Sequence, residues 1–116
     1  MPRNMSFFLT TQQMRDRTKT VTRRLGWKFA KSGDVINACV KCQGLKAGET
    51  VEGICQIVVT SVRFEPLNRI YDEGPRGCSL EGFPEMSPRE FVTMFCDAMK
   101  CRPAEQVTRI EFEFME

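Results

Sequence analysis

The residues best suited to chemistry form one short segment near the N-terminus, residues 18–24, with the sequence TKTVTRR. This segment holds three hydroxyl side chains and three cationic side chains, but only one apolar residue. Burying so many polar groups without partners would be costly, so the segment is not typical of a core strand. The basic cluster favours phosphate or another anion as a partner, although a solvent-exposed basic face without a ligand would have the same composition.

The charge of the chain is divided unevenly along its length. The 116 residues carry 17 basic and 15 acidic side chains, a formal net charge of +2. Residues 1–31 hold eight of the basic side chains and one of the acidic ones, a net charge of +7, and the rest of the chain carries −5. Such an asymmetry can indicate a nucleic-acid partner.

The sequence contains no histidine. This excludes Ser–His and Cys–His dyads and any His-ligated catalytic metal, so acid–base chemistry would rest on Lys, Asp, Glu, Tyr or Cys. We expect no metal and no other cofactor. Cys39 and Cys42 have zinc-knuckle spacing, but no second pair repeats it, and an extended backbone would send these two thiols to opposite faces. The six cysteines are expected to be reduced thiols.

Length and composition indicate one globular domain over residues 1–116. No apolar run approaches the roughly 20 residues of a membrane-spanning helix. The N-terminus lacks the apolar centre of a secretion signal, so we expect a cytoplasmic protein with no membrane partner. The oligomeric state is left open by the sequence.

The elements that would position the basic segment are predicted from periodicity and capping signals. A first strand is expected at residues 5–9, followed by a brief helix at 12–15 that Thr10 or Thr11 caps. If residues 18–24 are helical, Lys19 and Thr22 lie on one side of the helix. If the segment is extended, Thr20, Thr22 and Arg24 share a face instead.

Further along, strands are predicted at residues 34–40, 51–64 and 106–114, with a hairpin loop at 43–49 and a plausible bulge at Gly53. Ile110, Phe112 and Phe114 of the last strand are expected to face inward, and Arg109 outward. Residues 72–86 are read as a long loop. Ser87 to Glu90 form a capping box that opens a helix, with its apolar stripe at Phe91, Met94 or Phe95, Ala98 and Met99. The order of elements predicts a small α+β domain whose strands close on themselves.

Three motifs in this order resemble the ASCH domain family. They are Lys19-Thr20-Val21-Thr22-Arg23-Arg24, then Gly33-Asp34 opening a strand, and Glu81-Gly82-Phe83 before a helix. The resemblance covers nearly the whole chain. It implies a PUA-like β-barrel of about five to six strands with two or three short helices, associated with RNA and nucleotide chemistry. Family members often have glycine two residues before the lysine, where this chain has Arg17.

The acetylcytidine amidohydrolase branch of that family implies roles for individual residues. By motif position, Lys19 would be the base, Thr22 the nucleophile and Glu81 the proton donor. The remaining candidates, which would contact nucleic acid or nucleotide, are Arg17, Thr20, Arg23, Arg24 and Trp27.

The chemistry is plausible from the residues alone. Crowding by Arg23 and Arg24 should lower the pKa of Lys19 and make its neutral form available as a base. Threonine needs such a base to act as a nucleophile. An apolar setting beside Leu80 and Phe83 would suit Glu81 to proton donation. Lys19 and Glu81 could equally be an ion pair that joins a loop to the barrel.

Three functions follow as hypotheses. The first is a hydrolase that acts on an acylated or otherwise modified nucleoside. The second is a non-catalytic module that binds RNA or nucleotide, and the third is a ribonuclease that uses the same cleft.

Overall fold

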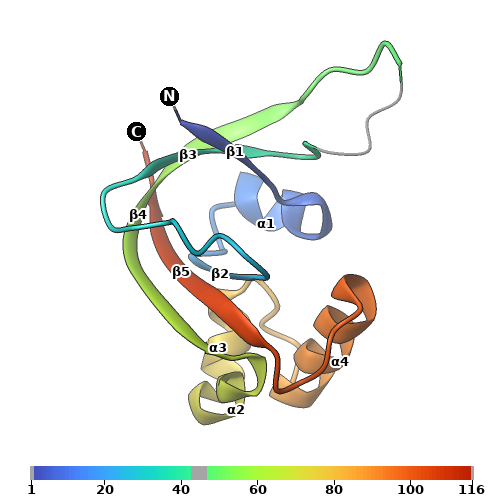
Figure 1. Ribbon diagram of the computed structural model, residues 1–116. Helices are drawn as coiled ribbons and strands as arrows, with labels where there is room; N and C mark the ends of the chain where they lie inside the picture. The colour runs from blue at the N-terminus through green and yellow to red at the C-terminus, as the bar shows by residue number, and fades with distance from the viewer. Residues whose placement is uncertain (1, 43–46, 116) are drawn as a thin grey trace.

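The fold is built on one five-stranded sheet (Figure 1). The computed structural model describes residues 2–42 and 47–115. Across the sheet the strands follow the order β1 (Arg3–Ser6), β3 (Val35–Cys39), β4 (Gly53–Pro66), β5 (Gln106–Phe114) and β2 (Val21–Arg24). β1 runs parallel to β3, and the other neighbouring strands are antiparallel.

In the described residues, four α-helices and two 3-10 turns connect the strands. The turn η1 (Phe8–Thr10) and α1 (Thr11–Arg15) lie between β1 and β2. The segment between β4 and β5 forms η2 (Leu67–Arg69), α2 (Ile70–Glu73), α3 (Pro75–Leu80) and α4 (Pro88–Met99). None of these helices combines the length and the apolar character that a bilayer crossing requires.

The sheet curls into a half-barrel, with β4 along its outer curve and α2, α3 and α4 at one end (Figure 1). The predicted α+β class is confirmed, but closure into a PUA-like barrel is not, because β1 and β2 are the two ends of the sheet. Between these two edges, a side chain makes the connection. Nη1 of Arg24 in β2 donates to the carbonyl oxygen of Ser6 in β1 at 2.6 Å.

Two buried clusters hold the curled sheet and its helices together. One packs α1 against the sheet, through Met5, Phe7, Met14, Ala30, Ile36, Ala38, Ile57, Val59, Ile110 and Phe112. The other packs α2, α3 and α4 against the far end of β5, through Leu67, Ile70, Cys78, Phe83, Phe91, Val92, Phe95 and Val107. The segment before β2 meets the end of α3, where the Thr20 amide donates to the carbonyl of Leu80.

The last strand has the predicted bounds, and its alternation holds for Ile110 and Phe112, which are buried. Arg109 was expected to face solvent and is 4% exposed instead. Its guanidinium lies under α2, where Glu73 accepts two hydrogen bonds from it at 3.0 Å. A charged side chain on the outer face of a strand is therefore buried by a helix that sequence periodicity could not place there.

Several boundary predictions are corrected. β1 ends at Ser6, and Phe8 to Thr10 already turn. Neither threonine caps α1 through its side chain, because the hydroxyl of Thr11 donates backward to the carbonyl of Phe7. The expected loop at residues 72–86 contains α3, which begins at Pro75 and buries Gly77 and Cys78. The hairpin loop expected at 43–49 lies partly outside the described residues.

The capping box at the start of α4 is confirmed. The Ser87 hydroxyl accepts from the Glu90 amide at 3.2 Å, and the Glu90 carboxylate accepts from the Ser87 amide at 2.9 Å. The predicted apolar stripe is correct for Phe91 and Phe95, but the last turn of the helix leaves the core, so Ala98 and Met99 are exposed. Val92, which the predicted stripe did not include, is buried.

Removing the cap should therefore have a measurable effect on stability. We expect Ser87→Ala to lower the free energy of unfolding by about 1 kcal/mol, because the Glu90 amide in the first turn of α4 loses its acceptor. Urea denaturation measures the change, and Ser61→Ala, at an exposed position of β4, is the control. Equal stability of the two variants would show that the cap contributes nothing in solution.

Candidate functional site

The basic segment forms an extended strand from Val21 onward, which settles the choice between helix and strand. It is fixed by backbone hydrogen bonds on both sides of Thr20, from the Phe112 amide and to the carbonyl of Leu80. The turn that leads into it passes through Arg17, whose φ of 61° lies in the left-handed region. This is the position at which the ASCH resemblance has glycine, the residue that adopts this conformation most readily.

Lys19 and Glu81, which are 62 residues apart in the chain, meet in the structure. Nζ of Lys19 donates to Oε1 of Glu81 at 2.7 Å and to the carbonyl oxygen of the same residue at 2.9 Å. Both side chains are 3% exposed. The end of α3 reaches Lys19 through Gly82, which has a φ of 100°, and a Cβ there would lie 2.9 Å from Gln13. Only glycine fits this turn without displacing α1.

The second oxygen of Glu81 is held by an arginine. Nη1 of Arg23 donates to Oε2 of Glu81 at 2.8 Å, and the Arg23 side chain is fully buried. We expected an apolar setting for Glu81, and the structure places it between two cations instead. Both oxygens of the Glu81 carboxylate therefore accept a hydrogen bond from a cation.

Burial shapes the ionisation of Lys19. Desolvation lowers the pKa of Lys19, and this effect outweighs the opposing attraction of Glu81; the nearby charges of Arg24 and Arg23 lower it further. The neutral amine is thus more accessible than on an exposed lysine.

Thr22 and Arg24 lie on the same face of β2, and Nε of Arg24 donates to the Thr22 hydroxyl oxygen at 3.0 Å. The Arg24 guanidinium also lies 4.6 Å from the centre of the Phe7 ring. Burial lowers the pKa of Arg24 to about 10, which leaves it cationic at neutral pH. Among the described residues no hydrogen bond joins Thr22 to Lys19.

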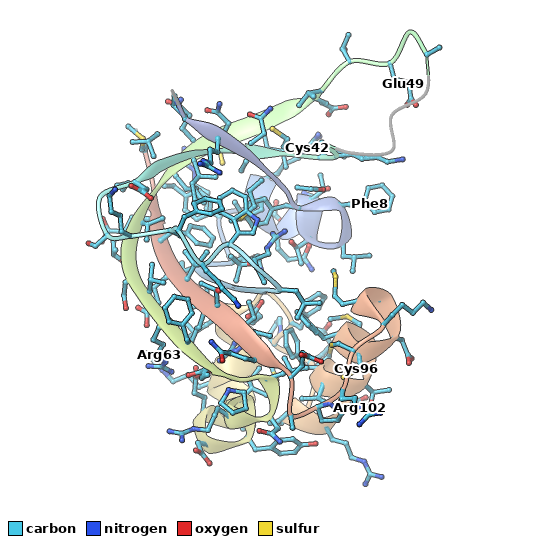
Figure 2. All side chains as sticks on the ribbon, viewed as in Figure 1. Phe8, Cys42, Glu49, Arg63, Cys96 and Arg102 are labelled. Atoms are coloured by element: carbon cyan, nitrogen blue, oxygen red, sulfur yellow. The ribbon has the colours of Figure 1, made fainter. Side chains whose placement is uncertain are left out.

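These residues line one cavity of about 400 Å³. Its polar end is formed by Lys19, Thr22, Arg23, Arg24 and Glu81. Its other walls are mostly apolar, with Phe7, Phe8 and Leu9 on the side of η1 and Met94, Phe95 and Met99 on α4. Figure 2 shows the Phe8 ring on the open side of the molecule and Arg63 on the outer side of the curled sheet. The cavity is of the size and mixed character that small-molecule sites have.

The other predicted contact residues are divided between two places. Trp27 is half-buried, lines the same cavity and packs on Phe29 with ring centres 5.0 Å apart. Thr20 lines a second cavity, of about 570 Å³, with Arg63 and Arg109. Arg17 is exposed, and its guanidinium lies 5.4 Å from the centre of the Phe114 ring. The residues predicted to contact nucleic acid or nucleotide therefore do not lie on one continuous surface.

The sequence missed Glu73, at the end of α2. Its carboxylate accepts hydrogen bonds from Arg23, Arg63 and Arg109. Burial alone would raise the pKa of Glu73, but the Arg109 hydrogen bond and the charges of Arg23, Arg109 and Arg63 lower it below its ordinary value. The clue to an acidic partner is a row of three arginines, because Arg109 of β5 is the register partner of Arg23 in β2 and of Arg63 in β4. That row can be recognised only once the strand register is known.

In the part of the chain that the structure describes, no group of three or more Cys, Asp or Glu side chains is arranged to hold a metal ion. The six cysteines, Cys39 and Cys42 included, are free thiols.

Comparison with known proteins gives structural neighbours only. No protein-family model matches the chain, and a search of the curated proteins finds no match. A crystal structure of hypothetical protein PH0355 has a TM-score of 0.68 and 19% identity, over 99% of this chain and 100% of that one. Protein EF3133 from Enterococcus faecalis V583, described with the family DUF984, has a TM-score of 0.62 and 15% identity, over 99% of this chain and 76% of that one. At these identities the likeness shows the fold alone.

Proposed function

We propose that this chain is an ASCH-type domain that binds a modified nucleoside in the cavity and hydrolyses its acyl amide. The observation that carries the proposal is the buried pair of Lys19 and Glu81, which lies in the wall of a cavity that Thr22 and Arg24 also line. A buried ion pair contributes little to stability on average, whereas perturbed ionisable groups in a cleft are typical of functional sites. The likeness of the motif residues to the ASCH family supports the same assignment.

The ion pair of Lys19 and Glu81 can supply the two protonation states that the reaction needs, a neutral amine as base and a protonated carboxyl as proton donor. Transfer of one proton from Nζ of Lys19 to Oε1 of Glu81, along the 2.7 Å hydrogen bond, leaves a neutral amine and a neutral carboxylic acid. Burial favours this neutral pair relative to water, because it removes two charges from a low-dielectric site. Lys19 then acts as the base and Glu81 as the proton donor.

Hydrolysis would proceed through an acylated threonine. The Lys19 amine takes the Thr22 hydroxyl proton as Oγ1 attacks the acyl carbonyl carbon. The bond from that carbon to the nucleobase nitrogen breaks, and Glu81 gives the leaving nitrogen its proton. The Lys19 ammonium then returns its proton to the Glu81 carboxylate along their hydrogen bond, and the neutral amine takes a proton from a water that attacks the threonine ester. The Thr22 oxygen leaves and takes that proton back from Lys19, which releases the carboxylic acid and restores the hydroxyl. Atoms and protons balance without a cofactor.

Arg24 is suited to hold the developing negative charge. Its hydrogen bond to the Thr22 hydroxyl favours the ionised oxygen during attack. A guanidinium fixed by Ser6 and Phe7 at the edge of the cavity is already oriented for an oxyanion, which is the arrangement that lowers such barriers most.

A substrate screen tests the proposal directly. The purified protein is incubated with cytidines and adenosines that carry acyl groups on the exocyclic nitrogen, with unmodified nucleosides and with short single-stranded RNAs. We expect release of the free nucleoside from at least one acylated substrate, and none from the same substrate with the Lys19→Met variant. Absence of turnover on the whole panel would remove the hydrolase assignment, and cleavage of RNA would replace it with a ribonuclease.

Binding without turnover is the second candidate, and one observation favours it. Arg3 lies with its guanidinium 3.9 Å from the centre of the Phe29 ring, and the exposed Lys28 stands between Phe29 and Trp27 in sequence, so cations and rings lie together at the end of the cavity lined by Trp27. If this surface binds RNA, affinity should fall as salt rises, and the double variant Arg3→Ala/Lys28→Ala should reduce that slope by about two. An affinity that does not change with salt would rule this candidate out.

A further inference from the structure

We infer that Glu73 is a positioning residue of the proposed site: it holds Arg23, and Arg23 holds the carboxylate of Glu81 against Lys19. The inference rests on the proposed function for its catalytic consequence. The geometry itself is a continuous series of ion pairs that runs from the outer face of the sheet, where Arg63 is half exposed, to the buried amine of Lys19.

The guanidinium of Arg23 depends on two carboxylates for its placement. Nη1 donates to Glu81 at 2.8 Å, and Nη2 donates to Glu73 at 2.6 Å. Nε is buried and has no hydrogen-bond partner in the described part of the chain, and Glu65 approaches Nη2 only at 3.5 Å. Without Glu73, Arg23 would therefore keep one close carboxylate contact, with Glu81, and its guanidinium would no longer be held from both sides.

Glu73 is itself fixed more firmly than a single ion pair could fix it. Arg109 donates from Nε and Nη2 to the two carboxylate oxygens, each at 3.0 Å, and Arg63 adds a hydrogen bond at 3.1 Å. These two arginines are register partners on β4 and β5, so the rigid centre of the sheet sets where the Glu73 carboxylate lies. The paired forks of guanidinium and carboxylate give this contact directional precision.

The consequence reaches Lys19 by charge and by geometry. The charged groups that face its amine are Glu81 from the end of α3 and Arg23 and Arg24 from β2. If the Glu73 charge is lost, the charge of Arg23 is no longer balanced from its far side. Arg23 then draws the Glu81 carboxylate toward itself and away from Lys19, and both changes disfavour the protonated amine.

The test compares two substitutions that remove the same charge from the same arginine. Glu73→Gln removes the carboxylate that pairs with Arg23, Arg63 and Arg109, whereas Glu111→Gln removes a carboxylate that pairs with Arg109 alone. For Glu73→Gln we expect kcat on the acylated nucleoside to fall about 10- to 100-fold with little change in KM, and the acid limb of the pH profile to move to lower pH. Glu111→Gln should leave both close to those of the unmutated protein.

A second measurement does not depend on activity. In protein labelled with ¹³C at lysine Cε, the signal of Lys19, assigned with Lys19→Arg, should titrate at lower pH in Glu73→Gln than in Glu111→Gln. Equal titration of Lys19 in the two variants would overturn the positioning role, even if no substrate were turned over. If Lys19 titrates at lower pH in Glu73→Gln but the unmutated protein turns over no substrate, the positioning role of Glu73 is supported and the proposed function is rejected. If Glu73→Gln does not fold, Glu73→Asp keeps the charge but ends one carbon short of Arg23, so we expect changes of kcat and of the Lys19 titration in the same direction and of smaller size.

Discussion

Thr22→Ala is expected to reduce turnover of the acylated nucleoside by about three orders of magnitude, with the fold unchanged. The hydroxyl is the atom that would attack the acyl carbon, and Arg24 in the same strand holds its oxygen at 3.0 Å. Removing it leaves Lys19 with no nucleophile to activate except water. Because alanine fits the space that threonine leaves, and β2 keeps its backbone hydrogen bonds to β5, the loss should appear in kcat rather than in stability.

Two further variants sharpen this expectation. Thr22→Ser keeps the hydroxyl and should keep a substantial part of the rate. Thr93→Ala removes a hydroxyl from the exposed side of α4 and should have no effect. If Thr22→Ala retained the rate while Lys19→Met lost it, the lysine would activate water directly, and the threonine would not be the nucleophile. Steady-state kinetics and a trap for the acylated threonine distinguish these outcomes.

The second large effect concerns stability. Lys19→Met leaves the Glu81 carboxylate buried without its amine, and Glu81→Gln leaves the amine buried without its carboxylate. We expect each to lower the free energy of unfolding by about 3 kcal/mol. The double variant Lys19→Met/Glu81→Gln has neither charge, and its glutamine can still accept from Arg23, so we expect it to lie within about 1 kcal/mol of the unmutated protein. It should be inactive.

Urea denaturation of the four proteins forms a double-mutant cycle. The exposed pair of Arg69 and Asp72, 3.1 Å apart on adjacent turns of η2 and α2, provides a matched comparison and should show a coupling of about 0.5 kcal/mol or less. A coupling between Lys19 and Glu81 that is no larger than this would mean that the pair is not closed in solution. A double variant as unstable as the singles would support a structural role for the ion pair instead.

The parts of the fold that the sequence predicts are those determined by neighbouring residues. The bounds of β5, the buried positions Ile110 and Phe112 within it, and the capping box at Ser87 follow from local patterns, and all are found as predicted. α3 was missed because its proline and glycine are typical of a loop, and its stability comes from burying Cys78 against α4 rather than from its own sequence. The exposed end of the α4 stripe was missed for a related reason, since Met94 and Met99 face a cavity that periodicity does not distinguish from a core.

The site divides in the same way. The juxtaposition of Lys19 and Glu81 was suggested by motif order and is found in the structure, whereas their catalytic roles stay a prediction. The buried state of Arg23 and Arg109 could not be anticipated, because a charged residue on the outer face of a strand is normally solvated. Their burial depends on Glu73, which reaches both only through the placement of α2 over the sheet.

The contact between Arg24 and the carbonyl of Ser6 gives one side chain two duties. It joins the edge strands β1 and β2 of the half-barrel, and it lines the cavity in which a ligand would bind. A ligand that draws this guanidinium into the cavity must weaken the hydrogen bond to Ser6, so ligand binding should increase the mobility of β1. Faster hydrogen exchange of the β1 amides would therefore reveal binding in the cavity, even for a ligand whose chemistry is still unknown.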